Sequence, residues 1–234
     1  MTKFLLETIN LKKSFSHKNG EINLFNNVNI KINKGEMVAL VGPSGSGKSS
    51  LLHLLALLDD PTKGKILINN KDTKILDNQE KDLIRQENIS IIFQENNLLS
   101  DFTAIENVTM PLIIKGVKSF LAEKKAKKIL KEINILNRKN HFPNEMSGGE
   151  QQRIAIARAL ISETDLILAD EPTGNLDHKN SRDIFTYFQK LKKLNKAVIF
   201  ATHNRELANM ADYKLSIYNG NIKRVDGNSK WRIQ

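Results

Sequence analysis

The chain has 234 residues, of which 40% are hydrophobic, and its formal net charge is +10. This length allows one large or two small domains with a real core, and the absence of cysteine excludes disulfides and thiolate metal sites. No stretch approaches the run of about 18 apolar residues that a membrane-spanning helix needs, and an acid at Glu7 comes too early for a secretory signal. We therefore expect a protein that stays in the cytoplasm.

The positive charge leaves two anionic partners open, nucleic acid and an anionic membrane surface. The lysines are spread along the chain, and the densest cluster, Lys124–Lys128, falls on a predicted helix. A solvated lysine face is the more ordinary explanation of this charge.

The first elements in chain order are strands. Phe4–Leu11 and Leu24–Ile32 alternate apolar and polar residues, as half-buried strands do, and turns are predicted at His17–Glu21 and Asn33–Glu36. Phe15 precedes the first turn. Its position fits an ordinary core residue and an aromatic on which adenine stacks equally well.

The strongest motif follows the apolar strand Met37–Val41 and precedes an apolar helix predicted over Ser50–Leu58. Glycines let backbone N–H groups turn toward phosphate oxygens, and the helix start adds its positive end. Lys48 supplies a cation for the β- and γ-phosphates, and Ser49 a hydroxyl for Mg²⁺. The strand–loop–helix context favours a nucleotide site over a glycine-rich turn that binds nothing. The predicted nucleotide-binding residues here are Gly42, Pro43, Ser44, Gly45, Ser46, Gly47, Lys48, Ser49 and Ser50.

A short strand over Lys65–Asn69 and a short helix over Gln79–Arg85 come next. Ile89–Phe93 is a buried strand that ends at Gln94. A polar residue at the carboxyl end of a parallel strand points into the ligand crevice. Gln94 is therefore placed to touch a metal or a water, with a plain loop glutamine as the alternative.

The pattern is helical from Asp101 to Ser162. Helices are predicted over Ala104–Ile114, with Pro111 as a possible kink, over Phe120–Ile135 and over Gln151–Ile161. Ser147-Gly148-Gly149-Glu150 opens the last of them and predicts a capping box. Two glycines at a helix start also expose backbone N–H groups to an anion.

Carboxylates end the next buried strand, Asp165–Ala169, at Asp170 and Glu171. In phosphate-loop proteins the first holds Mg²⁺ through its hydration shell, and the second can orient or deprotonate the attacking water. A further buried strand, Ala197–Ala201, places His203 at the same edge. The remaining predictions are a loop at Thr173–Asp177, helices over Lys179–Lys193 and Arg205–Met210, and a hairpin around Asn219-Gly220.

These motifs together resemble the ATPase subunit of ABC transporters, over essentially the whole chain. Lys48 and Asp170 are separated by far more residues than a compact phosphate-loop enzyme needs, and the excess is the helical segment that ends in Ser147–Glu150. By this resemblance Glu171, His203 and Gln94 are catalytic, and Ser49, Gln94 and Asp170 hold the metal. It also adds Phe15, Ser147, Gly148, Gly149 and Asp177 to the nucleotide-binding residues.

The resemblance implies an α/β fold with a phosphate-loop NTPase core around a mainly parallel sheet, an N-terminal antiparallel β subdomain and an inserted helical subdomain. Residues 1–94 and 163–234 would form the nucleotide-binding core of a single ABC ATPase domain, and residues 95–162 the helical subdomain. The implied ligands are ATP and Mg²⁺. The implied partners are a second copy, arranged head to tail with two ATP molecules between the phosphate loop of one copy and Ser147–Gly149 of the other, and integral membrane permease subunits of the lipoprotein-releasing type. These permease subunits would bind beside Gln94 and the helical segment.

Leu51–Leu55, Asp101–Val108 and Met110–Leu112 are similar to the lipoprotein-releasing branch of the family, whereas Ala169–Asp177 is shared with macrolide-type exporters and a cell-division ATPase. The resemblance thus implies an ATPase that powers release of outer-membrane-directed lipoproteins, peripheral on the cytoplasmic face of the bacterial inner membrane. A macrolide-type exporter or a cell-division regulatory complex is the alternative.

No nucleic-acid partner is expected, because DNA-repair ATPases of this fold usually carry a long coiled-coil or zinc insertion in the helical segment. Met146, Glu150 and Asn204 depart from commoner family usage.

Overall fold

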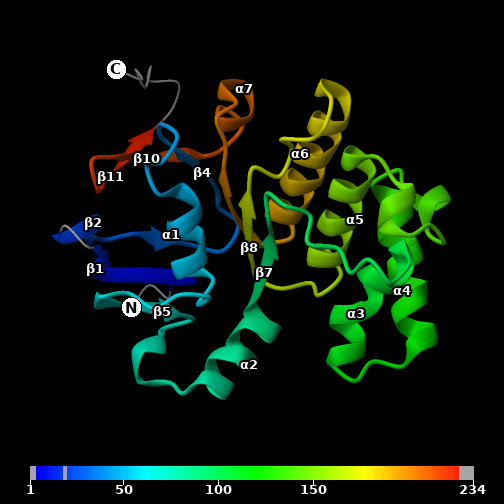
Figure 1. Ribbon diagram of the computed structural model, residues 1–234, viewed down its shortest axis with the longest axis horizontal. Helices are drawn as coiled ribbons and strands as arrows, with labels where there is room; N and C mark the ends of the chain where they lie inside the picture. Colours follow the sequence, from blue (N-terminus) through cyan, green and yellow to red (C-terminus); the bar gives the residue numbers. More distant parts are fainter. Residues whose placement is uncertain (1–3, 18–19, 227–234) are drawn as a thin grey trace.

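The computed structural model describes residues 4–17 and 20–226, and it contains two β-sheets and a group of helices (Figure 1). The antiparallel sheet lies at the left of Figure 1 and the helices α3 (Ala104–Ile114), α4 (Ser119–Glu132) and α5 (Gly148–Leu160) at the right, with β7 (Ile89–Ile92) and β8 (Leu166–Asp170) of the larger sheet between them. This is the predicted α/β class, with an antiparallel sheet at the N-terminal end of the chain.

The larger sheet has the strand order β11-β10-β4-β9-β8-β7. Every neighbouring pair is parallel except β10 with β11, which form the predicted hairpin. β4, β8 and β9 are buried along their whole length, as expected for parallel strands covered on both faces. The bounds are β4 (Met37–Val41), β7 (Ile89–Ile92), β8 (Leu166–Asp170), β9 (Ala197–Ala201), β10 (Tyr213–Tyr218) and β11 (Asn221–Asp226).

The smaller sheet corrects two predicted strands. The first strand continues past Leu11 to the end of β1, because register shifts around Lys13 disturb the alternation on which the prediction depended. The second is interrupted: Asn27 has a φ of 53°, and β2 ends at the next residue before β3 resumes the pairing. The sheet comprises β1 (Leu6–His17), β2 (Gly20–Val28), β3 (Lys31–Ile32), β5 (Lys63–Ile68) and β6 (Lys71–Asp72).

The predicted turn between these strands includes Lys18 and Asn19, which lie outside the described residues. On either side of it His17 pairs with Gly20. Two helices are shorter at their carboxyl ends than predicted, since α4 stops at Glu132 and α7 at Ala208.

The helices are α1 (Lys48–Leu55), α2 (Asn78–Asn88), α3 (Ala104–Ile114), α4 (Ser119–Glu132), α5 (Gly148–Leu160), α6 (His178–Lys193) and α7 (Arg205–Ala208), with 3-10 turns η1 (Thr73–Ile75), η2 (Leu136–Arg138) and η3 (Pro143–Glu145). No helix within the described ranges, 4–17 and 20–226, is both long and apolar enough to pass through a bilayer.

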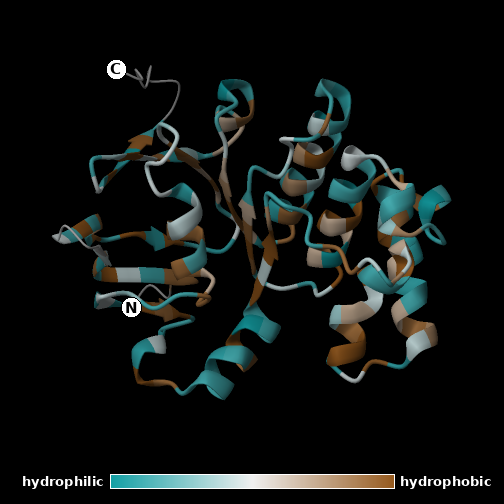
Figure 2. Cartoon of the chain, in the orientation of Figure 1, coloured by the Kyte–Doolittle hydropathy of each residue, from teal (hydrophilic) through white to brown (hydrophobic). Residues whose placement is uncertain are grey.

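Three apolar clusters hold these elements together. The first joins the two sheets and α1, and the second joins the larger sheet to α5 and α6. The third is made mainly by α3, α4 and α5 and includes Val108, Leu130 and Ile154, with Tyr187 of α6 packed against it. Figure 2 shows these apolar stripes on helices whose outer faces are hydrophilic. A separate cluster supports our proposal that residues 95–162 form a helical subdomain, with residues 1–94 and 163–234 as the core.

α5 connects that segment to the core. Its residues Ile156 and Leu160 pack in the second cluster, whereas Ile154 and Ala157 pack in the third. α5 thus packs against both the core and the helical segment. These contacts fix the position of its N-terminus, where Ser147–Glu150 lie.

Candidate active site

The phosphate loop runs from the buried end of β4 into α1, and its shape requires glycine. Gly47 is the N-cap of α1 with a φ of 95°, in the left-handed region. A Cβ there would lie 2.8 Å from Cζ of Phe25. At Gly42 a Cβ would lie 2.6 Å from the carbonyl oxygen of Ile217. The loop is therefore held against β2 and β10, with its backbone turned toward the start of α1.

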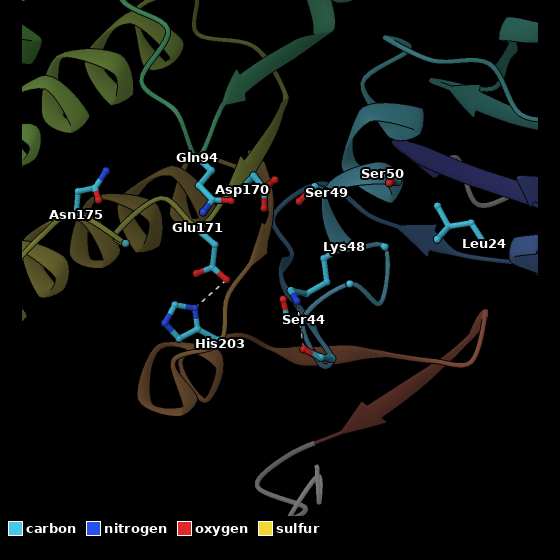
Figure 3. A pocket seen from close by; sticks show the side chains of 14 residues that line it. Leu24, Ser44, Lys48, Ser49, Ser50, Gln94, Asp170, Glu171, Asn175 and His203 are labelled. Carbon is cyan, nitrogen blue, oxygen red and sulfur yellow. Dashed lines mark hydrogen bonds and ion pairs between the residues drawn. The ribbon is translucent and has the colours of Figure 1, made fainter. Parts of the chain in front are cut away.

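Several polar groups of the loop lack strong partners within the chain. The Lys48 ammonium group lies back over the loop and donates to the carbonyls of Gly42 at 3.1 Å and Pro43 at 3.2 Å (Figure 3). The Ser46 hydroxyl is buried without a hydrogen-bond partner, and no side chain caps α1. An uncapped helix N-terminus with an unpartnered hydroxyl and a lysine ammonium beside it fits a nucleotide phosphate.

Neighbouring strands bring the other predicted groups to the same place. β7, β8 and β9 are adjacent and parallel, so the residues at their carboxyl ends meet at one edge. Gln94, Asp170, Glu171 and His203 line a pocket of about 550 Å³ that faces Lys48. The remaining lining residues are Leu24, Gly42, Ser44, Gly45, Gly47, Ser49, Ser50, Gly174 and Asn175.

Glu171 and His203 are already paired in this pocket. Nδ1 of the imidazole lies 3.0 Å from Oε1 of the carboxylate, and the dashed line in Figure 3 marks the contact. The Glu171 side chain is only 14% exposed, whereas that of His203 is 79% exposed. Glu171 also has a φ of 44°, a conformation that a non-glycine residue adopts at a cost and that clusters at functional sites. This geometry can hold a carboxylate base toward a water beside the phosphate loop.

The donor set fits magnesium bound together with phosphate. The described residues contain no group of three or more His, Cys, Asp or Glu side chains able to hold a metal by themselves. A hydroxyl from Ser49, an amide oxygen from Gln94 and a carboxylate from Asp170 nevertheless share one pocket. Mg²⁺ is commonly held by one or two carboxylates, waters and substrate phosphates, so this incomplete set is what such a site requires.

The segment Ser147–Glu150, the signature segment, lies outside this pocket. Ser147 and Glu150 form the predicted capping box: the Ser147 N–H donates to Glu150 Oε2 at 2.9 Å, and the Glu150 N–H donates to Ser147 Oγ at 3.3 Å. The backbone N–H of Ser147, and then Arg138, hold the pKa of Glu150 below its ordinary value. Ser147, Gly148 and Gly149 line no part of the pocket that contains Lys48. Gly149 instead packs against the loop between β8 and α6. A Cβ on Gly149 would lie 3.2 Å from the carbonyl oxygen of Asn175 in that loop.

Four further predicted residues, Phe15, Pro43, Ser46 and Asp177, also lie apart from the lining. Asp177 caps α6 by accepting the Asn180 N–H at 2.8 Å, and that bond holds the pKa of Asp177 below its ordinary value. Phe15 is 45% exposed on β1, with the Lys13 ammonium 4.9 Å from its ring centroid. Phe15 is therefore no core residue, but it does not line the pocket. Pro43 contributes its carbonyl to Lys48.

The sequence did not indicate the roles of Leu24 and Glu206. Leu24 is a β2 residue that joins the pocket only because the register of β1 and β2 shifts beside it. Glu206, on α7, accepts from Arg182 at 2.6 Å and contacts His178 Nε2 at 3.1 Å, both on α6. Asn204, one of the departures from common usage, caps α7 through the N–H groups of Glu206 and Leu207. These contacts tie the segment after His203 to the helix that follows Asp177.

Residues 25–174 match the ABC transporter family. The chain is 45% identical over 218 residues to the lipoprotein-releasing system ATP-binding protein LolD of Rickettsia bellii, covering 92% of this chain and 96% of that protein. It is 44% identical to the LolD protein of Rickettsia felis with the same coverage.

Solved structures agree with the fold. The dimeric structure of MJ0796, a bacterial ABC transporter cassette, aligns with a TM-score of 0.91 at 37% identity, covering 96% of this chain and all of that one. A dimeric post-hydrolysis state of the same cassette, bound to ADP and Pi, aligns equally well at 36% identity.

Proposed function

This chain belongs to the ABC transporter family, and on that premise we propose that it is the ATP-hydrolysing subunit of a complex that releases outer-membrane-directed lipoproteins from the inner membrane. The Rickettsia LolD proteins support the lipoprotein branch, because the likeness extends over more than nine-tenths of both chains. The observation that carries the ATPase activity is the pocket in which Lys48, Asp170 and the Glu171–His203 pair face one another.

In the proposed reaction, the phosphate loop binds ATP through its backbone N–H groups and the N-terminus of α1. Lys48 leaves the carbonyls of Gly42 and Pro43 and contacts the β- and γ-phosphates. Glu171 orients the attacking water and takes its proton, while His203 keeps that carboxylate directed at the water and faces the γ-phosphate.

Ser49, Gln94 and Asp170 would hold Mg²⁺. The ion neutralises charge on the β- and γ-phosphate oxygens. The phosphate nest, the uncapped helix start and the strand-end carboxylate are consistent with this assignment.

The active form in this proposal is a head-to-tail homodimer. Ser147, Gly148 and Gly149 lie outside the chain's own pocket, so their exposed helix start is available to the nucleotide of a second copy. Because that helix start gains an anionic partner only when the γ-phosphate is present, ATP binds the closed dimer better than the open one. Hydrolysis removes this preference and lets the dimer open. The related MJ0796 cassette is dimeric, which supports the proposal.

We place the permease subunits in a groove between the core and the helical segment. This groove has a volume of about 560 Å³ and an apolar floor that includes Phe93, Met110, Pro111 and Ile114. Arg158 crosses it and donates to the carbonyls of Asn96 and Asn97, just after Gln94. A segment bound here would sense movement of Gln94. The chain would then sit on the cytoplasmic face of the inner membrane, held by these subunits.

The experiment that tests this function is purification of the tagged chain with its partners from detergent-solubilised membranes. We expect two integral membrane subunits of the lipoprotein-releasing type and release of a lipoprotein from reconstituted membranes on addition of ATP. The same complex carrying Glu171→Gln should release none. Recovery of an exporter or a cell-division membrane protein in their place would contradict the lipoprotein branch while leaving the ATPase activity intact.

A further inference from the structure

The helical segment ends in an exposed apolar tip that the proposed ATPase cycle does not use. This α3–α4 tip comprises residues 113–121, the end of α3, a turn at Gly116 with a φ of 78°, and the start of α4. The exposed fractions are 42% for Ile113, 68% for Ile114, 67% for Phe120 and 43% for Leu121. Figure 2 shows the apolar end of α3 at the bottom of the molecule. Four large apolar side chains exposed within nine residues indicate a contact surface.

Positive charge surrounds the tip. Residues 113–132 contain seven lysines and two glutamates, so they carry +5 of the net +10 of the whole chain. Lys118 and Lys124 are exposed, and neither forms an ion pair within the described part of the chain. The tip therefore matches an anionic surface better than a neutral one.

The lysines and the phenylalanine share one face of α4. Lys124, Lys127 and Lys131 follow Phe120 at spacings of four, seven and eleven residues, which places them on the same side of the helix. The opposite side is buried and includes Ala122, Ala126 and Leu130. α4 thus carries an aromatic side chain at its start and a stripe of lysines above it. Apolar side chains that enter a headgroup region beneath a row of lysines produce this pattern.

The tip borders the groove proposed for the permease subunits. Ile114 and Lys115 line that groove, whereas Ile113, Phe120 and Leu121 do not. A segment bound in the groove would therefore leave Ile113, Phe120 and Leu121 uncovered.

We propose that the α3–α4 tip binds anionic lipid headgroups directly, with Phe120 and Ile113 entering the interface and the lysines of α4 contacting phosphates. The proposal rests on the proposed function in one respect: that function determines which membrane the tip faces.

The test is flotation of the purified full-length chain with lipid vesicles. We expect binding to phosphatidylcholine vesicles in which about one lipid in three is phosphatidylglycerol, weak binding to pure phosphatidylcholine, and loss of binding in high salt. The double variant Ile113→Ser/Phe120→Ser should bind the anionic vesicles about tenfold more weakly. Lys118→Gln/Lys124→Gln should weaken binding by a similar factor.

Matched controls come from the other end of the molecule. Ile75 is 80% exposed on η1, and Lys74 and Lys223 are exposed lysines near the antiparallel sheet and the C-terminal hairpin. Ile75→Ser and Lys74→Gln/Lys223→Gln should leave vesicle binding within about twofold of the unmodified chain.

Each outcome decides the proposal. If the unmodified chain does not bind anionic vesicles, or if the control variants lose as much binding as the tip variants, the tip is no lipid contact. If the unmodified chain does not bind anionic vesicles but still binds its permease subunits, the exposed apolar tip is assigned to a protein partner instead of a lipid. ATP affinity is measured on every variant. Unchanged ATP affinity with lost vesicle binding separates failure of this proposal from failure of the ATPase assignment.

Discussion

The two halves of the proposed ATP sandwich differ in how far one chain completes them. The phosphate-loop half is assembled within the monomer: glycines at tight positions, Lys48 over the loop and a paired Glu171–His203 all face one pocket. The signature half is equally ordered, with a closed capping box at Ser147 and Glu150, but its residues Ser147, Gly148 and Gly149 line no part of that pocket. In the proposed sandwich, the phosphate-loop half would therefore be completed by the signature half of a second copy.

The largest effect is expected when the base is removed from the phosphate-loop half. Glu171→Gln keeps the size of the side chain and its place beside His203, yet it cannot accept the proton. ATP turnover should fall by about 10²–10⁴-fold, while ATP binding persists and a dimer accumulates in light scattering. Glu163→Gln is the matched control, because Glu163 also has a positive φ, 54°, but lies outside the pocket. Turnover within a few-fold of the unmodified chain would exclude Glu171 as the base.

The next effect concerns ground-state binding in the same half. Lys48→Ala removes the one side-chain cation of the phosphate loop, and charge-assisted hydrogen bonds to the phosphates disappear with it. ATP affinity measured by titration calorimetry should fall by about 10- to 100-fold. Lys74→Ala, an exposed lysine on η1, should leave the affinity unchanged. An unaltered affinity in Lys48→Ala would make the assignment of this loop wrong.

A smaller effect tests the contacts that support His203 in the phosphate-loop half. Glu206 ties α7, just after His203, to Arg182 and His178 on α6. Glu206→Gln should lower kcat about threefold without changing ATP affinity, since exposed pairs of this kind contribute little energy and act here through the position of His203. Asp183→Asn, an exposed carboxylate on α6, is the control. An equal loss in both variants would show that Glu206 has no positioning role.

The smallest effect concerns stability of the signature half. Glu150 has a lowered pKa in the folded chain because it accepts from the Ser147 N–H and pairs with Arg138. Its contribution is therefore present above its ordinary pKa of 4.5 and is lost as the pH falls through the lowered value. Glu150→Gln should be less stable at neutral pH by under about 1 kcal/mol, because Gln can also close a capping box.

Urea unfolding across pH checks this. The difference between the unmodified chain and Glu150→Gln should shrink as the pH falls below 4.5. Glu123→Gln, which breaks only the exposed pair with Lys127, provides the comparison. If the difference in unfolding free energy between the unmodified chain and Glu150→Gln does not change with pH, the ionised Glu150 carboxylate is not its cause.

The assembled half was also the more predictable one from sequence. The phosphate loop, Asp170, Glu171 and His203 follow short apolar strands, and parallel strands must bring their carboxyl ends together, so local patterns were sufficient. The ranges of α3 and β9 were predicted without error.

Other features depend on long-range packing that no local pattern records. The bulges of β1, the arrival of Leu24 in the pocket and the contacts of Glu206 all arise from neighbours distant in sequence. The same limit applies to the signature. The capping box of the signature was predictable from sequence. The position of the signature relative to the pocket was not, because it depends on how α5 packs between two clusters.

The most direct test of the incomplete site is Ser147→Arg, which places a bulky cation at the cap of α5. Because Ser147 lies outside the pocket of its own chain, the ATP affinity of the monomer should match that of the unmodified protein. In a Glu171→Gln background, however, ATP should no longer produce dimers in light scattering. Ser119→Arg, at the start of α4, should still dimerise. If Ser147→Arg instead loses ATP affinity as severely as Lys48→Ala, the signature acts within its own chain and the head-to-tail dimer is wrong.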